Sequence, residues 1–297
     1  MRVAVTGASG LVGTALVRAL SADGHEVLRL VRRQPHEPTE IQWDPDRSLI
    51  DAEVLEGVEG VVHLSGANIA GGRFTEERKA LLRSSRVEPT RLLSETLARL
   101  SKRPRVLVSA SALGYYGDRG DAWVTEADPP ANDFLGRLSV EWEQACDPAR
   151  KAGIRVVNPR FGIVLSPAGG ALRTMLPPFK LGLGGVLGPG TQYVSWIAID
   201  DLVDAIRRLL VQESVGSPVN TASPHPVTNR ELTKTLGRVL RRPTVAKVPA
   251  FVLRLALGEA ADALLGSTRM SAEKLVGCGF RFRFPELEPA LRHLLAP

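Results

Sequence analysis

The sequence predicts an α/β fold with a doubly wound parallel sheet and a smaller C-terminal substrate or lid region. Short apolar runs alternate with longer amphipathic stretches through the first half, which is typical of βαβ units. A glycine-rich turn joins the first apolar run to the first amphipathic stretch. After residue 158 the composition changes, and Gly and Pro become frequent. The chain of 297 residues is long enough to bury a full core.

Each element follows from local pattern. Strands are expected at Arg2–Thr6, Glu26–Val31, 60–65, Val106–Ser109, 154–157 and 218–222, and helices at Leu11–Ala22, 75–100, 134–151 and 200–210. Residues 166–190 are expected to form a loop because they are rich in Gly and Pro. Thr228 and Glu231 have the spacing of a capping box for a helix at 228–240.

The composition favours a small anionic ligand. The net charge of +6 is scattered and the aromatic content is 5%, whereas nucleic-acid binding needs a basic stripe with aromatic platforms. The chain has neither a signal core nor an apolar run of about 20 residues, so no membrane partner is expected. The two cysteines, Cys146 and Cys278, lack metal or redox spacing, and no metal site is expected. We expect a cytoplasmic monomer or homodimer that acts on a small-molecule substrate.

The glycine-rich turn, TGASGLVG at residues 6–13, lies between the first strand and the first helix. Gly7 allows a tight turn, Gly10 allows close approach of a pyrophosphate, and Gly13 allows the helix to pack on the strand. The phosphate would meet free N–H groups at the positive end of the helix dipole. This is the pattern of a Rossmann dinucleotide site, and the expected contacts are Gly7, Ser9, Gly10, Leu11, Val12 and Gly13.

The second strand ends in Arg32 and Arg33, where NAD-specific proteins of this architecture carry an acidic residue for the ribose. A guanidinium there offers a permanent charge and a fork of donors to a 2′-phosphate. The expected cofactor is therefore NADP(H). The alternative is that both arginines only solvate the end of a strand.

Further motifs accompany these features, at residues 63–68 (HLSGAN), 109–111 (SAS), 74–90, 112–117, 158–170 and 178–201. With them the chain resembles the extended short-chain dehydrogenase/reductase superfamily, and more closely its atypical subgroup labelled "epimerase family protein", along essentially its whole length. The resemblance implies an NADP-binding Rossmann domain at 1–165, with 191–225 returning to it, and a smaller region at 166–190 and 226–297. It also implies cofactor contacts at Leu64, Ser65, Gly66, Arg86, Ser109 and Arg160.

The superfamily's Tyr-x-x-x-Lys pair is missing. The matching positions are Phe134 and Leu138, which can neither transfer a proton nor hold a ribose hydroxyl. The remaining candidates are Ser111, which matches the serine that binds the substrate oxygen, Tyr115 or the adjacent Tyr116, and Arg137 as a basic substitute. Each also has a structural interpretation as a packing or solvated residue.

The substrate is not evident. Val194 stands where nucleotide-sugar enzymes resembling this chain carry an arginine for the substrate pyrophosphate. Replacement cations could be Arg160, Arg173 or Lys180. A further set, Lys79, Arg83 and Arg86, shares one helix face, which is either an anion-binding wall or an ordinary charged surface.

Two functions remain open. One is an NADP(H)-dependent oxidoreductase or epimerase, and the other is a non-catalytic NADP(H)-binding regulatory protein, which the missing pair favours.

Overall fold

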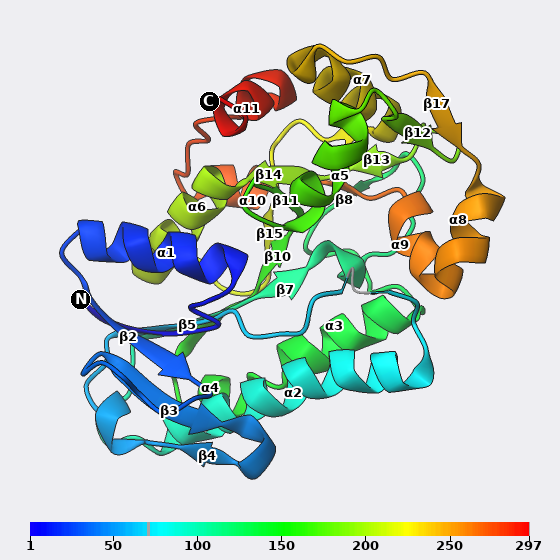
Figure 1. Ribbon diagram of the computed structural model, residues 1–297. Helices are drawn as coiled ribbons and strands as arrows, with labels where there is room; N and C mark the ends of the chain where they lie inside the picture. Colours follow the sequence, from blue (N-terminus) through cyan, green and yellow to red (C-terminus); the bar gives the residue numbers. More distant parts are fainter. Residues whose placement is uncertain (70–71, 297) are drawn as a thin grey trace.

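The computed structural model describes residues 1–69 and 72–296 and has an α/β architecture around one large sheet (Figure 1). The strands of this sheet follow the spatial order β4 (Leu49–Ile50), β3 (Glu40–Asp44), β2 (Glu26–Val31), β1 (Arg2–Thr6), β5 (Gly60–His63), β6 (Val106–Ser109) and β9 (Arg155–Val157). All neighbours are parallel except β3 and β4, which pair antiparallel at the edge. This order reverses direction between β1 and β5, so the predicted Rossmann-type doubly wound sheet is confirmed.

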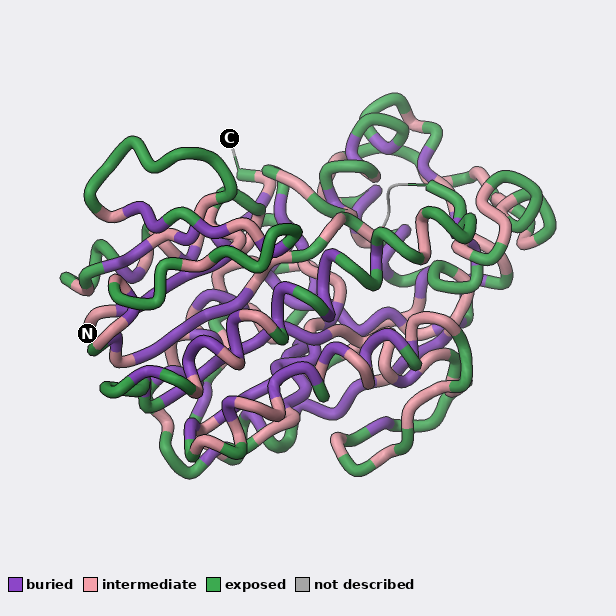
Figure 2. The backbone as a smooth tube through the Cα atoms, turned by 90° about the horizontal axis from the view of Figure 1, so that it is seen from below, coloured by how far each residue is buried: buried purple, intermediate pink, exposed green. Residues whose placement is uncertain are grey.

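Helices cover both faces of the sheet (Figure 1). On one face lie α1 (Leu11–Ala22) and α6 (Ile199–Val211), whose buried side chains share a core with β1, β5 and β6. On the other face lie α2 (Glu76–Arg99), α3 (Phe134–Gln144) and α4 (Asp147–Lys151), and residues of α2 and α4 pack there against the sheet and Trp43. Figure 2 shows the buried chain running through the middle of the molecule, with exposed chain in the outer loops.

The rest of the chain forms smaller sheets beyond the carboxyl ends of the central strands. The pairings join β7 (Ser111–Ala112) to β10 (Pro159–Phe161) and β15 (Val219–Thr221), β11 (Ile163–Leu165) to β14 (Trp196–Ala198), β12 (Gly185–Leu187) to β17 (Ala246–Val248), β13 (Tyr193–Val194) to β16 (Val227–Thr228), and β8 (Trp123–Val124) to β18 (Arg269–Met270). The remaining helices are α5 (Gly170–Lys180), α7 (Asn229–Leu240), α8 (Ala250–Leu257), α9 (Asp262–Leu265), α10 (Glu273–Gly277) and α11 (Leu287–Leu294). The short 3₁₀ turns are η1 (Pro45–Arg47), η2 (Glu53–Leu55), η3 (Leu113–Tyr115) and η4 (Gly258–Ala261). A second core packs α5, α7 and α11 together.

Most local expectations are met. Strands β1, β2 and β6 and helix α1 have the expected bounds, while β5 ends at His63. Helix α2 continues through Pro89, and Thr75 caps it by accepting a hydrogen bond from the backbone N–H of Arg78. The predicted capping box is present, since Thr228 and Glu231 bond each other's backbone N–H groups.

Two expectations are wrong. Residues 134–151 form two helices, α3 and α4, instead of one, because Pro148 lacks the N–H that would bond the carbonyl of Gln144. Residues 166–190 are not only a loop, since they contain α5 and β12. The buried Leu172, Leu176 and Phe179 have helical spacing, a signal that the surrounding Gly and Pro residues obscured.

Among residues 1–69 and 72–296, no helix is long and apolar enough to cross a membrane. The same residues contain no group of three or more His, Cys, Asp or Glu side chains placed to hold a metal ion.

Replacement of Leu97 tests the packing of α2 on the sheet. Leu97 is completely buried, and we expect Leu97→Ala to lower the free energy of unfolding by about 2–5 kcal/mol through lost burial and a cavity. Leu81, on the same helix, is 48% exposed, and Leu81→Ala should change it by less than about 0.5 kcal/mol. Urea titrations followed by circular dichroism measure both values, and equal losses would contradict this account of the packing.

Candidate functional site

The glycine loop has the close contacts that a dinucleotide cradle requires. Gly7 has a φ of 66°, and a Cβ there would lie 2.8 Å from the carbonyl carbon of Leu64. A Cβ on Gly13 would lie 2.1 Å from the carbonyl oxygen of Gly7. Both positions therefore exclude any side chain, as the sequence predicts.

Helix α1 begins directly after this loop, and Gly10 is its N-cap residue without a capping side chain. The first-turn N–H groups of Leu11, Val12 and Gly13 have no acceptor within a helix. The Leu11 side chain packs beside Gly169 and Gly170. Val12 packs against the core that α1 and α6 share with the central sheet. The positive end of α1 is thus available to an anion.

A cavity of about 580 Å³ opens between this loop and the ends of β2 and β3. Its lining consists of Gly7, Ala8, Ser9, Thr14, Val17, Arg29, Leu30, Val31, Arg32, Arg33, Glu40, Trp43 and Ser65. Of the predicted cofactor residues it brings together Gly7, Ser9, Arg32, Arg33 and Ser65. A side chain at Gly7 would clash with the β5 loop that closes this cavity. The shape and the donor groups of the site fit a dinucleotide.

The two predicted arginines differ in their partners. Arg33 forms a two-point ion pair with Glu40, at 2.6 and 2.7 Å, and Glu40 also accepts a hydrogen bond from the N–H of His36. The bonds from Arg33 and His36 lower the pKa of Glu40 to about 2, and its side chain is buried. Arg32 is exposed and makes no hydrogen bond or ion pair with any described residue. Arg32 is the cation free to meet a phosphate.

Sequence reasoning missed Glu40 because it did not assign β3. Residues 40–44 (EIQWD) are too short to show a clear alternation of apolar and polar residues. A glutamate such as Glu40 is also rarely buried in a folded protein. Its pairing with Arg33, together with Arg29 at 3.4 Å and the N–H of His36, compensates the buried charge.

The end of β5 is fixed by a buried histidine. The hydroxyl of Thr90 donates to the carbonyl oxygen of Arg86 at 2.6 Å, so it accepts a hydrogen bond from Nε2 of His63 at 2.9 Å. Nδ1 of His63 then accepts from the hydroxyl of Thr6, at 2.7 Å. Burial lowers the pKa of His63 to about 3, so the ring is neutral. His63 packs and orients the loop that carries Leu64, Ser65 and Gly66.

Arg86 lies behind this loop, in contrast to its neighbours on α2. Its guanidinium donates to the carbonyl oxygens of Ala67 and Leu82 and lies 5.2 Å from the centroid of the Trp142 ring. Gly66 packs on it so closely that a Cβ would lie 3.2 Å from its central carbon. Burial lowers the pKa of Arg86 to about 10.

The other two basic residues of that helix face have acidic partners. Lys79 pairs with Glu76 and Glu259, and Arg83 pairs with Glu88 and Glu141. The three basic residues therefore do not form one anion-binding wall, and only Arg86 reaches the loop.

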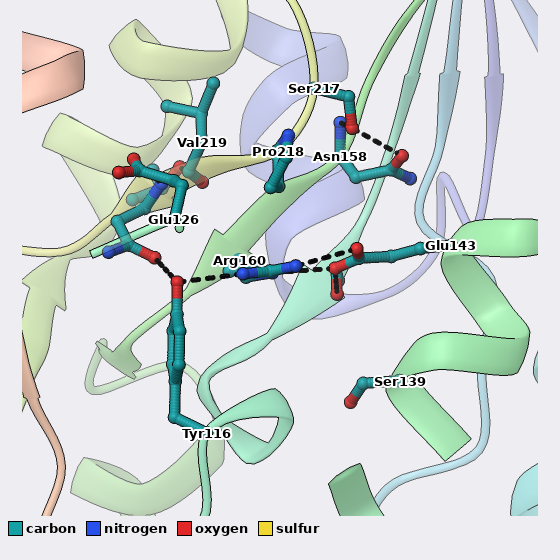
Figure 3. Close-up of polar contacts among 12 residues, drawn as sticks. Tyr116, Glu126, Ser139, Glu143, Asn158, Arg160, Ser217, Pro218 and Val219 are labelled. Atoms are coloured by element: carbon teal, nitrogen blue, oxygen red, sulfur yellow. Dashed lines mark hydrogen bonds and ion pairs between the residues drawn. The ribbon is translucent and has the colours of Figure 1, made fainter. Parts of the chain in front are cut away.

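A buried polar cluster lies beyond the end of β6 (Figure 3). Arg160 on β10 donates from Nε and one terminal nitrogen to the carboxylate of Glu143 on α3, at 2.8 and 2.9 Å. The hydroxyl of Ser111 donates to the same carboxylate at 2.7 Å. Arg160 is 2% exposed, and its remaining terminal nitrogen donates to the Tyr116 hydroxyl at 2.9 Å. The structure thus gives Arg160 internal partners and places it outside the cavity lining.

The tyrosines complete this cluster. The Tyr116 hydroxyl donates to Oδ1 of Asn220 at 2.6 Å, and burial raises the pKa of Tyr116 to about 12. The ring of Tyr115 is half-buried and covers the Arg160 guanidinium, with 3.3 Å between its centroid and the guanidinium carbon. Tyr115 is therefore the more accessible of the two phenols.

The other predicted residues do not join the hydrogen-bonded cluster of Ser111, Glu143 and Arg160. Ser109 is fully buried, and its carbonyl oxygen accepts from the side chain of Asn158. Arg137 is exposed and donates to the carbonyl oxygen of Asn132. Phe134 and Leu138 belong to an apolar cluster under α2.

The cations that could replace the missing arginine for the substrate pyrophosphate do not form one group in the structure. Arg173 and Lys180 are exposed, and Val194 is buried in the second core. Glu143, in contrast, was missed, because nothing in the local sequence distinguishes it from Glu141 two residues earlier.

The family models agree with this architecture. Residues 3–222 match the NAD dependent epimerase/dehydratase family, and residues 248–294 match a domain of unknown function. An epimerase family protein of Mycobacterium bovis is 44% identical over 290 residues, which are 97% of this chain and 96% of that protein.

Solved structures agree as well. The crystal structure of the human epimerase family protein SDR39U1 with NADPH has a TM-score of 0.89 and 33% identity, and covers 99% of both chains. A nucleoside-diphosphate sugar epimerase from Corynebacterium glutamicum has a TM-score of 0.81 and 37% identity over 99% of this chain and 58% of that one. The glycine cradle, the sheet order and these likenesses together show that this chain belongs to the NAD dependent epimerase/dehydratase family.

Proposed function

We propose that this protein binds NADP(H) and acts as an oxidoreductase, of the epimerase-like kind, on a small polar substrate. The observation that carries the proposal is the unpaired Arg32 at a cavity of about 580 Å³ that is lined by the glycine loop, where Gly7 admits no side chain. The human relative solved with NADPH supports the same cofactor. Both cysteines are free thiols, which fits the proposed cytoplasmic location.

The difference in ion pairing between Arg32 and Arg33 supports NADP(H) over NAD(H). Glu40 neutralises Arg33 and fixes it at the edge of β3, so Arg33 shapes the adenosine end of the cavity. Arg32 retains its full charge and its donors for a 2′-phosphate. The first-turn N–H groups of α1 and the hydroxyl of Ser9 would hold the pyrophosphate. The bound nicotinamide would supply hydride transfer.

The residues proposed for the reaction are Ser111, Tyr115 and the exposed Arg137. Ser111 gives its only proton to Glu143, so its oxygen keeps lone pairs that can accept a hydrogen bond from a substrate hydroxyl. The Tyr115 ring lies on the guanidinium of Arg160, which shares the Glu143 carboxylate with Ser111, and its phenol could orient the same oxygen. A proton could then pass from the substrate hydroxyl to Oγ of Ser111 while the proton that Ser111 already carries moves to the carboxylate of Glu143.

A regulatory, non-catalytic protein is the second candidate. The observation in its favour is the apolar packing of Phe134 and Leu138, the positions that match the usual proton-transfer pair. In that case NADP(H) occupancy would change the pose of the C-terminal region without chemistry.

Replacement of Arg32 tests the choice of cofactor. We expect Arg32→Ala to weaken NADPH binding by about 10- to 100-fold, because a charge-assisted pair with the 2′-phosphate is lost. NADH affinity should change by less than about twofold, since it lacks that phosphate. Fluorescence titration of both cofactors measures this, with the exposed Arg18→Ala as the control. Equal losses for NADPH and NADH would contradict the assignment.

Replacement of Gly13 tests the cradle itself. The Cβ of Gly13→Ala would meet the Gly7 carbonyl oxygen, so the loop must move, and NADPH affinity should fall by about tenfold or more. Gly277→Ala is the matched control, since a Cβ there meets nothing within 4 Å. Titration and a thermal melt of each variant separate loss of binding from loss of fold. Unchanged affinity in a folded Gly13→Ala variant would refute the cradle.

Turnover separates the two candidate functions. The NADPH complex is supplied with a panel of carbonyl compounds and nucleotide sugars, and oxidation of NADPH is followed by absorbance. For any compound that reacts, Ser111→Ala should lower kcat by about 100-fold with little change in NADPH affinity. Tight NADPH binding without turnover across the panel would instead favour the regulatory protein, which predicts altered protease sensitivity of residues 226–297 on binding.

A further inference from the structure

Helix α8 is apolar but uncovered. Of the described helices with eight or more residues, it alone has no buried residue. Its sequence, AFVLRLAL, contains one polar side chain, Arg254. Phe251 and Leu255 stand one turn apart on the same face and are 71% and 77% exposed. Such side chains in water need a partner or a function.

Neighbouring elements extend this apolar area. Strand β12 pairs with β17, which leads into α8, and Figure 1 shows the three at one edge of the molecule. The turn before β12 carries Leu181 and Leu183, and Val245 precedes β17; their exposed fractions are 75%, 67% and 84%. We call these five residues, Leu181, Leu183, Val245, Phe251 and Leu255, the apolar tip.

The surroundings of the apolar tip are strongly basic. Residues 230–257 contain seven Lys or Arg and one acidic residue, Glu231. Two of the seven, Arg238 and Arg254, pair with Glu288 and Asp262 of neighbouring helices. Lys180, Arg242 and Lys247 are exposed and form no ion pair with any described residue. The tip therefore combines protruding apolar side chains with uncompensated positive charge.

This combination selects among possible occupants. A two-fold contact with a second copy would bring the basic residues near one apolar tip against the same residues of the other copy, which is repulsive. A peptide that fills a groove needs a concave wall, whereas these side chains protrude from separate elements. Exposed apolar side chains with Lys180, Arg242 and Lys247 near them in sequence match the interface of an anionic bilayer, where the apolar side chains enter the acyl boundary and the cations meet phosphates.

We propose that the apolar tip is a peripheral docking site for an anionic lipid surface. The site lies outside the cofactor cavity and goes beyond the proposed oxidoreductase function. It differs from the expectation from the sequence that no membrane is a partner. That expectation considered only spanning segments, and an eight-residue apolar helix is too short to register as one.

Co-sedimentation of the full chain with vesicles tests the proposal. We expect binding to vesicles of equal parts phosphatidylglycerol and phosphatidylcholine, weakening with added salt, and no binding to phosphatidylcholine alone. Phe251→Ser/Leu255→Ser should lower the affinity by about tenfold or more, because two apolar side chains leave the bilayer. Arg242→Glu/Lys247→Glu should have a similar effect through lost attraction.

Matched controls use exposed residues elsewhere. Leu49→Ser/Leu81→Ser removes comparable exposed apolar side chains, and Arg18→Glu/Arg91→Glu makes the same charge change; each should stay within about twofold of the unaltered chain. Failure of the unaltered chain to sediment with anionic vesicles would overturn the proposal. So would equal binding to phosphatidylcholine alone, or a dimer by light scattering that Phe251→Ser/Leu255→Ser dissociates.

Discussion

The ion pair between Glu143 and Arg160 is the interaction on which the candidate site depends. It joins α3, which covers the central sheet, to β10, which begins the smaller sheets. Through Ser111, Tyr116 and Asn220 the same pair reaches β7, the residue that follows η3, and β15. Removal of one partner from such a buried pair costs about 3–5 kcal/mol, because the other charge is left without compensation. The cluster therefore fixes the geometry around Ser111 and Tyr115.

Charge is arranged differently at the two ends of the site. At the adenosine end, Glu40 binds Arg33 and leaves Arg32 unpaired, so one cation is structural and one is available. Near Ser111, the charge of Arg160 is neutralised by Glu143. An anionic cofactor group is thus attracted to the rim, while the interior beside Ser111 carries no net charge from that pair.

Local sequence was sufficient for most of the dinucleotide half of the fold, except β3 and β4. The glycine loop, β1, α1, β2 and β6 could be assigned because turn residues and apolar periodicity act over a few neighbouring residues. The exclusion of side chains at Gly7 and Gly13 also followed from the motif. The break at Pro148 and helix α5 were missed, although Pro148 and the spacing of Leu172, Leu176 and Phe179 carried the information.

The sequence alone predicted the doubly wound sheet and the glycine cradle, since apolar periodicity and glycine spacing are local patterns. The absence of the Tyr-x-x-x-Lys pair followed from the comparison of Phe134 and Leu138 with the motif of the superfamily. Only the tertiary structure decided which charged side chains are free. Arg32 differs from Arg33, and Glu143 from Glu141, through partners on other strands and helices that no local pattern specifies. Burial and ion pairing depend on contacts between distant segments, and the chain must fold before those contacts exist.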